Sequence, residues 1–97
     1  MSTISLAILN LHLYMPENQS LKQKRGIIKP ILAKLHHDYN LSASEVDHLN
    51  SWKESLIVCA VVSNDSVHNE KILQKAATAI ESAFPHIYIL DQSIEFI

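Results

Sequence analysis

The amino-acid sequence predicts an α+β fold in which two helices cover one face of a four-stranded antiparallel sheet. Four short apolar segments are typical of strands, and two longer segments between them repeat apolar residues at helical spacing. The chain has 97 residues, of which 47% are hydrophobic and 19% are charged. This composition excludes a disordered chain, and the length fits a single domain over residues 1–97.

The first half of the chain predicts a strand, a helix and a second strand. Residues 3–13 are rich in Ile and Leu, as strands are. Ser20 is a good N-cap and Gln23 completes a capping box, so we expect a helix that begins after Ser20 and runs to Tyr39. Residues 41–48 predict a more polar strand. The buried side of the helix would consist of Leu21, Ile28, Ile31, Leu32 and Leu35.

The second half predicts a strand, a helix and a final strand. Residues 55–63 form the most apolar segment of the chain. Three capping residues follow it, namely Asn64, Asp65 and Ser66. The inner face of the second helix would consist of Leu73, Ala76, Ala77, Ile80 and Phe84. Pro85 ends this helix, and residues 87–91, with an extension to Ile94, predict the last strand.

This order of elements predicts a ferredoxin-like βαββαβ sandwich. Two interleaved right-handed βαβ units place both helices on one face of the sheet. The first and third strands are then central, which agrees with their apolar character. The second strand would lie at an edge, where polar residues discourage pairing with other sheets. These polar residues are Ser42, Ser44, Glu45 and Asp47.

Three of the strands are apolar in both alternating phases, whereas a sheet with one covered face should alternate apolar and polar residues. The segments concerned are residues 6–9, 56–62 and 87–90. The face away from the helices would therefore be an apolar patch, which soluble monomers rarely expose. We expect a second copy of the chain to cover it, as a homodimer. The alternative cover is the C-terminal group Ile94, Phe96 and Ile97.

The predicted first helix concentrates positive charge. Residues 18–37 contain no acidic residue and five basic ones, namely Lys22, Lys24, Arg25, Lys29 and Lys34. The net charge of −2 therefore divides into +5 on this segment and −7 on the remainder. On a helical wheel Lys22, Arg25, Lys29 and His36 fall on one stripe beside the buried side. Pro30 lies four residues after Gly26, and we expect the helix to bend there but to continue.

Basic residues near a helix N-terminus predict an anion site, because free backbone N–H groups and the helix dipole also attract negative charge there. The expected ligand is a phosphate or a nucleic-acid backbone, and the alternative is a solvated face balanced by acidic residues elsewhere. Lys24 lies next to the apolar side, so its ammonium should extend past the helix end or pair with Glu45 or Asp47. The candidate anion-binding residues are Lys22, Lys24, Arg25 and Lys29.

A second group of polar residues lies between the middle strands and comprises Glu45, Asp47, His48 and Trp52. In strand geometry Glu45 and Asp47 share one face, where two carboxylates can bind a metal or perform acid–base chemistry. No third metal ligand has a convincing spacing, so solubility of the edge strand or pairing with Lys24 or Arg25 is the alternative. Trp52 is expected to be either a lid on the core or a platform for base stacking. His12 stands alone in its strand, and we expect no catalytic residue and no metal site.

Several functions are excluded by what the chain lacks. With a single glycine, Gly26, it has no glycine-rich phosphate loop. Cys59 is the only cysteine, so there is no disulfide framework. No apolar segment approaches the ~18 residues of a membrane span, and no basic residue precedes the first apolar stretch as in a secretory signal. We therefore expect a cytoplasmic protein with no membrane contact, no cofactor and no enzymatic activity.

Three motifs occur in a distinctive order and spacing. They are Ser20-Leu21-Lys22-Gln23-Lys24-Arg25, then Ala43-Ser44-Glu45-Val46-Asp47-His48 followed by Trp52, and Val61-Val62-Ser63-Asn64-Asp65. In this combination the chain resembles the YlxP-like family of small bacterial proteins over nearly its whole length. It departs from the family pattern at Asn50, where an acidic residue is common, and at Gly26 and Pro30, where the family has good helix formers.

The resemblance implies a ferredoxin-like fold and no established activity. Genes of this family often lie beside those for translation initiation factor two and ribosome-binding factor A, which implies ribosome-related work. The sequence thus leads to the hypothesis of a non-enzymatic module that binds ribosomal or other RNA through its basic first helix. The alternative is a dimeric protein-interaction or regulatory module without nucleic-acid contact.

Overall fold

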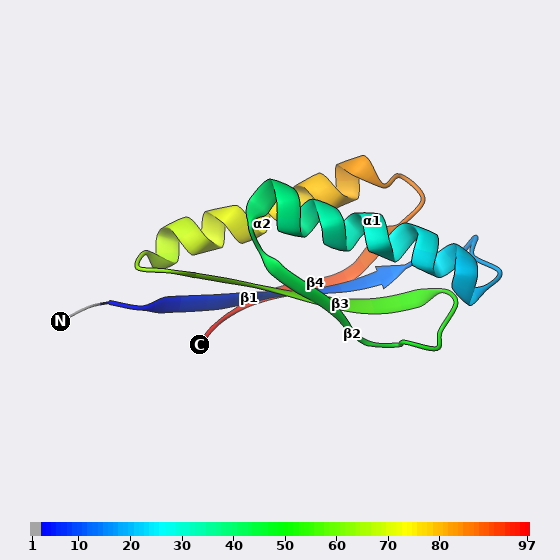
Figure 1. Ribbon diagram of the computed structural model, residues 1–97, viewed down its shortest axis with the longest axis horizontal. Helices are drawn as coiled ribbons and strands as arrows, with labels where there is room; N and C mark the ends of the chain where they lie inside the picture. The colour runs from blue at the N-terminus through cyan, green and yellow to red at the C-terminus, as the bar shows by residue number, and fades with distance from the viewer. Residues whose placement is uncertain (1–2) are drawn as a thin grey trace.

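Two helices pack on the same face of a four-stranded sheet in the computed structural model, which describes residues 3–97 (Figure 1). The strands lie in the order β2-β3-β1-β4 with antiparallel neighbours throughout, so β1 and β3 are central. The predicted ferredoxin-like βαββαβ arrangement is confirmed. In chain order the elements are β1 (Ser5–Tyr14), α1 (Leu21–Tyr39), β2 (Ser42–Asp47), β3 (Glu54–Ser63), α2 (Ser66–Ala83) and β4 (Tyr88–Phe96).

Capping residues determine where the helices begin and end. Ser20 accepts a hydrogen bond from the backbone N–H of Gln23 at 3.1 Å, and Asp65 accepts bonds from two N–H groups in the first turn of α2. Asn40 closes α1 in the left-handed conformation, with φ of 53°. As expected, α1 continues through Pro30. Neither helix of the described chain is long and apolar enough to cross a membrane.

The core lies between the helices and the covered face of the sheet. Every second residue of β1 from Ala7 to Leu13 is buried there. The facing residues of α1 and α2 are Ile28, Ile31, Leu35, Leu73, Ala76 and Ile80. Cys59 of β3 is part of this core, and its burial raises the pKa of the thiol to about 12. Cys59 is therefore not a candidate nucleophile, because the reactive form of cysteine is the thiolate.

The open face of the sheet is apolar at Leu6 and Ile8 of β1 and along most of β3, whereas the expectation of an apolar last strand holds only before a bulge, where Tyr88 lies opposite Tyr14 and is 58% exposed. A bulge in β4 shifts its register against β1 between Ile89 and Asp91. Beyond the bulge, Asp91 lies opposite His12 and Glu95 lies opposite Ile8. The aliphatic side chains that β1 and β3 place on the open face are Leu6, Ile8, Leu56, Val58, Ala60 and Val62.

The C-terminal residues do not cover this open face. Ile94 packs against the core on the helix side of the sheet. Phe96 lies opposite the buried Ala7 in the β1–β4 ladder and keeps 51% of its surface exposed. Ile97 extends the pairing of β4 through a backbone hydrogen bond to Leu6 and is 74% exposed. The alternative cover considered from the sequence is therefore excluded.

Gly26 provides a test of how α1 tolerates Pro30. A Cβ atom at Gly26 would meet nothing within 4 Å, and glycine in a helix interior costs roughly 0.5–1 kcal/mol relative to alanine. We expect Gly26→Ala to raise the free energy of unfolding by about that amount, measured by urea denaturation. The matched control is Ala33→Gly, at an exposed position of the same helix, which should lower the free energy of unfolding by a similar amount. A loss of stability in Gly26→Ala would mean that Pro30 requires the freedom of the glycine backbone.

Candidate functional site

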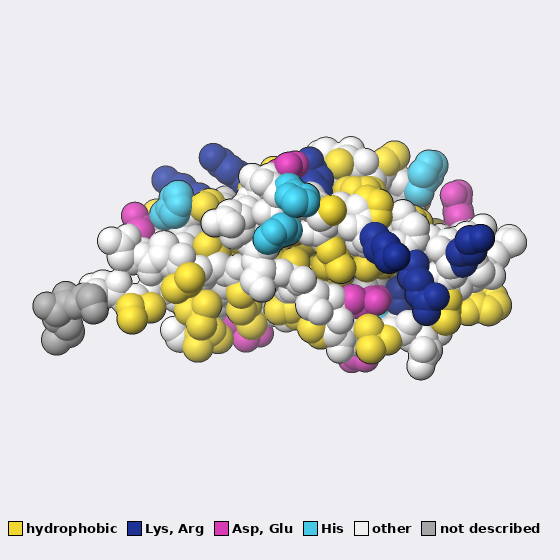
Figure 2. All heavy atoms as spheres, viewed as in Figure 1, with side chains coloured by type: hydrophobic (Ala, Val, Ile, Leu, Met, Phe, Trp, Pro, Cys, Tyr) yellow, Lys and Arg dark blue, Asp and Glu magenta, His cyan; other side chains and the backbone are white. Residues whose placement is uncertain are grey.

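Three exposed cations form a stripe along α1, which we call the basic stripe: Lys22, Arg25 and Lys29. Figure 2 shows Lys and Arg side chains gathered over the N-terminal half of α1. Together with Gly26 and Pro30, the three residues line a hollow of about 440 Å³. Within residues 3–97 none of the three forms an ion pair with a carboxylate. Their positive charge is therefore available to an anion from outside the molecule.

Lys24, by contrast, is buried between α1 and β2 with 2% of its side chain exposed. Its Nζ lies 2.8 Å from Oε2 of Glu45 and donates a hydrogen bond to the backbone carbonyl of His48. The same carboxylate oxygen accepts a hydrogen bond from Ser55 Oγ at 2.6 Å. The predicted pairing of Lys24 with Glu45 is confirmed. Because its ammonium is enclosed by these partners, we leave Lys24 out of the surface that an anion could reach.

The remaining lysine of the basic segment is also paired. Lys34 Nζ lies 2.8 Å from Asp38 Oδ2, one helical turn later on α1. The hydrogen bond to Asp38, together with the charge of that carboxylate, raises the pKa of Lys34. Two of the five positive charges in this segment are thus balanced inside the molecule, and the basic stripe carries the other three.

The four polar residues between the middle strands do not form one site. A register shift between Glu45 and Asp47 places them opposite Ile57 and Leu56, two neighbours on opposite faces of the sheet. The expectation that both carboxylates share one face is therefore wrong. Asp47 instead accepts a hydrogen bond from the backbone N–H of the next residue, at 2.7 Å. Trp52 is 52% exposed, which excludes a lid on the core.

The structure brings together three residues that the sequence left apart. His12 Nε2 lies 2.9 Å from Glu54 Oε1, and the His12 ring stacks on that of His48 with centroids 5.1 Å apart and planes 5° apart. One ligand atom from each of these residues lies within 4.8 Å of the others. His12 is therefore not isolated. The sequence alone indicates this cluster only weakly, because predicting the contact between His12 and Glu54 requires the register of β1 against β3.

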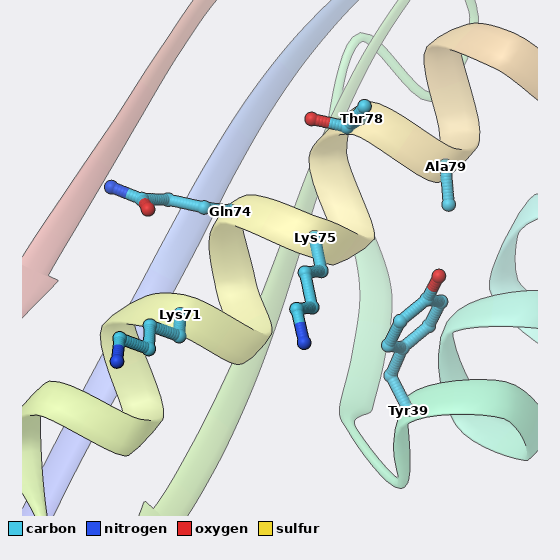
Figure 3. A pocket seen from close by; sticks show the side chains of 6 residues that line it. All are labelled: Tyr39, Lys71, Gln74, Lys75, Thr78 and Ala79. Carbon is cyan, nitrogen blue, oxygen red and sulfur yellow. The ribbon is translucent and has the colours of Figure 1, made fainter.

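Another hollow, of about 440 Å³, lies between the end of α1 and one side of α2 (Figure 3). Tyr39 stands against Ala79, and Lys75 extends on the same side of α2 as the tyrosine ring. Lys71 and Gln74 point away from that ring. No side-chain hydrogen bond joins any two of the described residues that line this hollow.

The buried ion pair can be tested by its contribution to folding. We expect Lys24→Met to lower the free energy of unfolding by about 3 kcal/mol, because Glu45 would lose its buried partner. The double variant Lys24→Met with Glu45→Leu removes both charges and should recover most of this loss. Urea denaturation followed by circular dichroism measures both values.

A matched control is Lys34→Met, which breaks the exposed ion pair with Asp38 and should change stability far less. If Lys24→Met and Lys34→Met had equal effects, the buried pair would have no special part in holding α1 against β2.

Comparisons with solved structures agree with the fold. A designed protein, "De novo designed protein Foldit4", is similar with a TM-score of 0.56 at 12% identity, over 96% of each chain. A "dimeric ferredoxin-like protein of unknown function" from Thermobifida fusca is similar with a TM-score of 0.52 at 13% identity, over 98% of this chain and 91% of that one. At these identities the likeness concerns the ferredoxin-like fold alone.

Comparisons of sequence are more specific. The chain is 38% identical over 68 residues to the "Uncharacterized protein YlxP" of Bacillus subtilis (strain 168), which is 70% of this chain and 73% of that protein. Residues 6–94 match the model of a family described as "Protein of unknown function (DUF503)". The match includes all of α1 and the residues around Lys24. The chain therefore belongs to the DUF503 family.

Proposed function

We propose that this protein is a non-enzymatic binding module that contacts the phosphate backbone of RNA, ribosomal or other, through the basic stripe. The observation that carries the proposal is the set of three exposed cations without carboxylate partners among the described residues: Lys22, Arg25 and Lys29. A solvated surface helix would usually mix both signs of charge, whereas α1 has no acidic residue before Asp38.

The spacing of the basic stripe suits a polyanion. Lys22 and Lys29 are seven residues apart, which corresponds to roughly 10 Å along a helix. Phosphates of one nucleic-acid strand are spaced roughly 3.4 Å apart along the helix axis, so this span covers about three phosphate intervals and each of the three cations can reach a phosphate. Contacts of this kind position a protein on RNA without reading its bases. The binding we propose is therefore independent of sequence.

Charge reversal in the basic stripe tests this proposal. With three phosphate contacts, log Kd for labelled poly(U) should rise with log salt with a slope of about 2. We expect Lys22→Glu with Arg25→Glu to weaken binding at least tenfold and to reduce the slope to below about 1, because only one contact remains. Fluorescence anisotropy over a series of salt concentrations measures both quantities.

The control for charge alone is Lys71→Glu with Lys75→Glu, which makes the same change in net charge on the exposed surface of α2. This variant should keep both the affinity and the salt slope to within a factor of about two to three, a change caused by the lower net charge. Binding that is absent, insensitive to salt, or equally weakened in both double variants would reject the basic stripe as an RNA contact.

We also propose that the protein forms a homodimer through the open face of its sheet. The supporting observation is the row of apolar residues that no helix covers, in which Leu6 lies opposite Val62 and Ile8 lies opposite Ala60. Figure 2 shows hydrophobic side chains along the lower edge of the molecule, below the sheet. In a two-fold symmetric dimer the same patch of both copies forms the interface, so a second copy of the chain is a matching partner. The similar protein from Thermobifida fusca is described as dimeric, which is in line with this proposal.

Val62 allows a matched test of the dimer. Val62 is 66% exposed on the open face, and Val67 is 58% exposed on α2. We expect Val62→Glu to convert a dimer into a folded monomer in sedimentation velocity, because the carboxylate would be buried without a partner at the interface. Val67→Glu should remain dimeric. A wild-type protein that sediments as a monomer at high concentration would overturn the proposal.

A further inference from the structure

We propose that His12, His48 and Glu54 bind a divalent transition-metal ion, with Zn²⁺ as the ion that fits best, on the open face of the sheet. The three residues come from β1, from the turn after β2 and from the start of β3. Two imidazole nitrogens and one carboxylate oxygen form a ligand set that zinc accepts, whereas Ca²⁺ and Mg²⁺ prefer oxygen alone. This site does not depend on the basic stripe or on its proposed function.

The distances suit an ion with short bonds. Bonds of roughly 2.0–2.2 Å in a tetrahedral site put neighbouring ligand atoms about 3.3–3.5 Å apart. The pair formed by His12 Nε2 and Glu54 Oε1 is at 2.9 Å, and the ligand atoms of all three residues lie within 4.8 Å of one another. An ion lies in the plane of each imidazole that binds it, whereas the rings of His12 and His48 are stacked with planes 5° apart, so one ring has to turn out of the stack to complete the geometry. The ion would take the place of the proton that His12 and Glu54 share.

The backbone already holds His48 in position for this role. His48 has φ of 59°, a left-handed conformation that is uncommon for residues other than glycine. Its N–H donates to Asp47 Oδ1 at 2.7 Å, and its carbonyl accepts hydrogen bonds from Lys24 Nζ and, at 3.0 Å, from the N–H of Ser51. These bonds hold the backbone of His48, and its imidazole stacks on that of His12. Metal binding would therefore have to reorient the ring of this ligand but not its backbone.

The surroundings favour a cation and leave one coordination position open. Asp91 lies opposite His12 in the β1–β4 ladder, on the same face, and adds a negative charge beside the cluster. In the single chain the side chains of His12 and Glu54 keep 30% and 39% of their surface exposed, and Glu54 lies at the opposite end of the β1–β3 ladder from the Leu6–Val62 pair of the proposed dimer face, so water can reach the ion there. Three protein ligands with an open fourth position are typical of zinc sites that bind water or a small molecule.

The test uses the full-length protein and Co²⁺ as a spectroscopic probe for the zinc position. We expect one Co²⁺ per chain with the visible absorption of a four-coordinate ion, and displacement by Zn²⁺. Each of His12→Gln, His48→Asn and Glu54→Gln should weaken binding at least tenfold. Asparagine is chosen at His48 because it tolerates the left-handed backbone. Circular dichroism checks that each variant is folded, and at least two folded variants are required.

A matched control removes two exposed histidines elsewhere, in His37→Gln with His68→Gln. This control should bind Co²⁺ and Zn²⁺ as the wild type does. Metal affinity that stays unchanged in folded His48→Asn and Glu54→Gln, or that falls only in the control, would overturn the proposal. So would a wild-type protein that binds no Co²⁺ at near-neutral pH, where imidazole is mostly unprotonated.

Discussion

The ammonium group of Lys24, buried beneath α1, makes the contacts on which both candidate surfaces depend. Its ion pair with Glu45 joins α1 to the edge strand β2, and its hydrogen bond to the carbonyl of His48 holds the turn that follows β2. A buried cation must be paired to be tolerated, so this arrangement constrains the helix and the turn together. With α1 held in this rotation, Lys22 and Arg25 point to solvent, while His48 lies over the open face of the sheet.

Much of the fold follows from patterns that can be recognised without coordinates. Helical spacing and capping residues locate α1 and α2, and the alternation in β1 identifies its buried side from Ala7 to Leu13. The wheel position of Lys24 also led to its partner, because a lysine at the edge of an apolar face needs a nearby carboxylate. These features are local, or nearly so, and local propensities agree with the final fold.

The features that could not be predicted arise from irregular pairing between strands. An extra residue at Val46 sends Glu45 and Asp47 to opposite faces, and the bulge before Asp91 makes the outer half of β4 polar on its open side. Neither bulge has a signature in the sequence, since each depends on how two strands fit together. The contact between His12 and Glu54 can be predicted only when the register of β1 and β3 is known. The position of His48 depends on its left-handed backbone conformation, which no neighbouring residue in the sequence indicates.

The uneven distribution of charge determines how this molecule meets a polyanion. Beyond one Debye length, about 8 Å at physiological ionic strength, the interactions of exposed charges are largely screened, and the net charge of −2 leaves no long-range attraction to a polyanion. Attraction begins once α1 faces the partner within that distance. Encounters are therefore selected by orientation and gain no long-range acceleration, in contrast to proteins with a strongly basic surface. If the basic stripe contacts a polyanion as proposed, attraction would act only in the orientations that bring α1 within this short range.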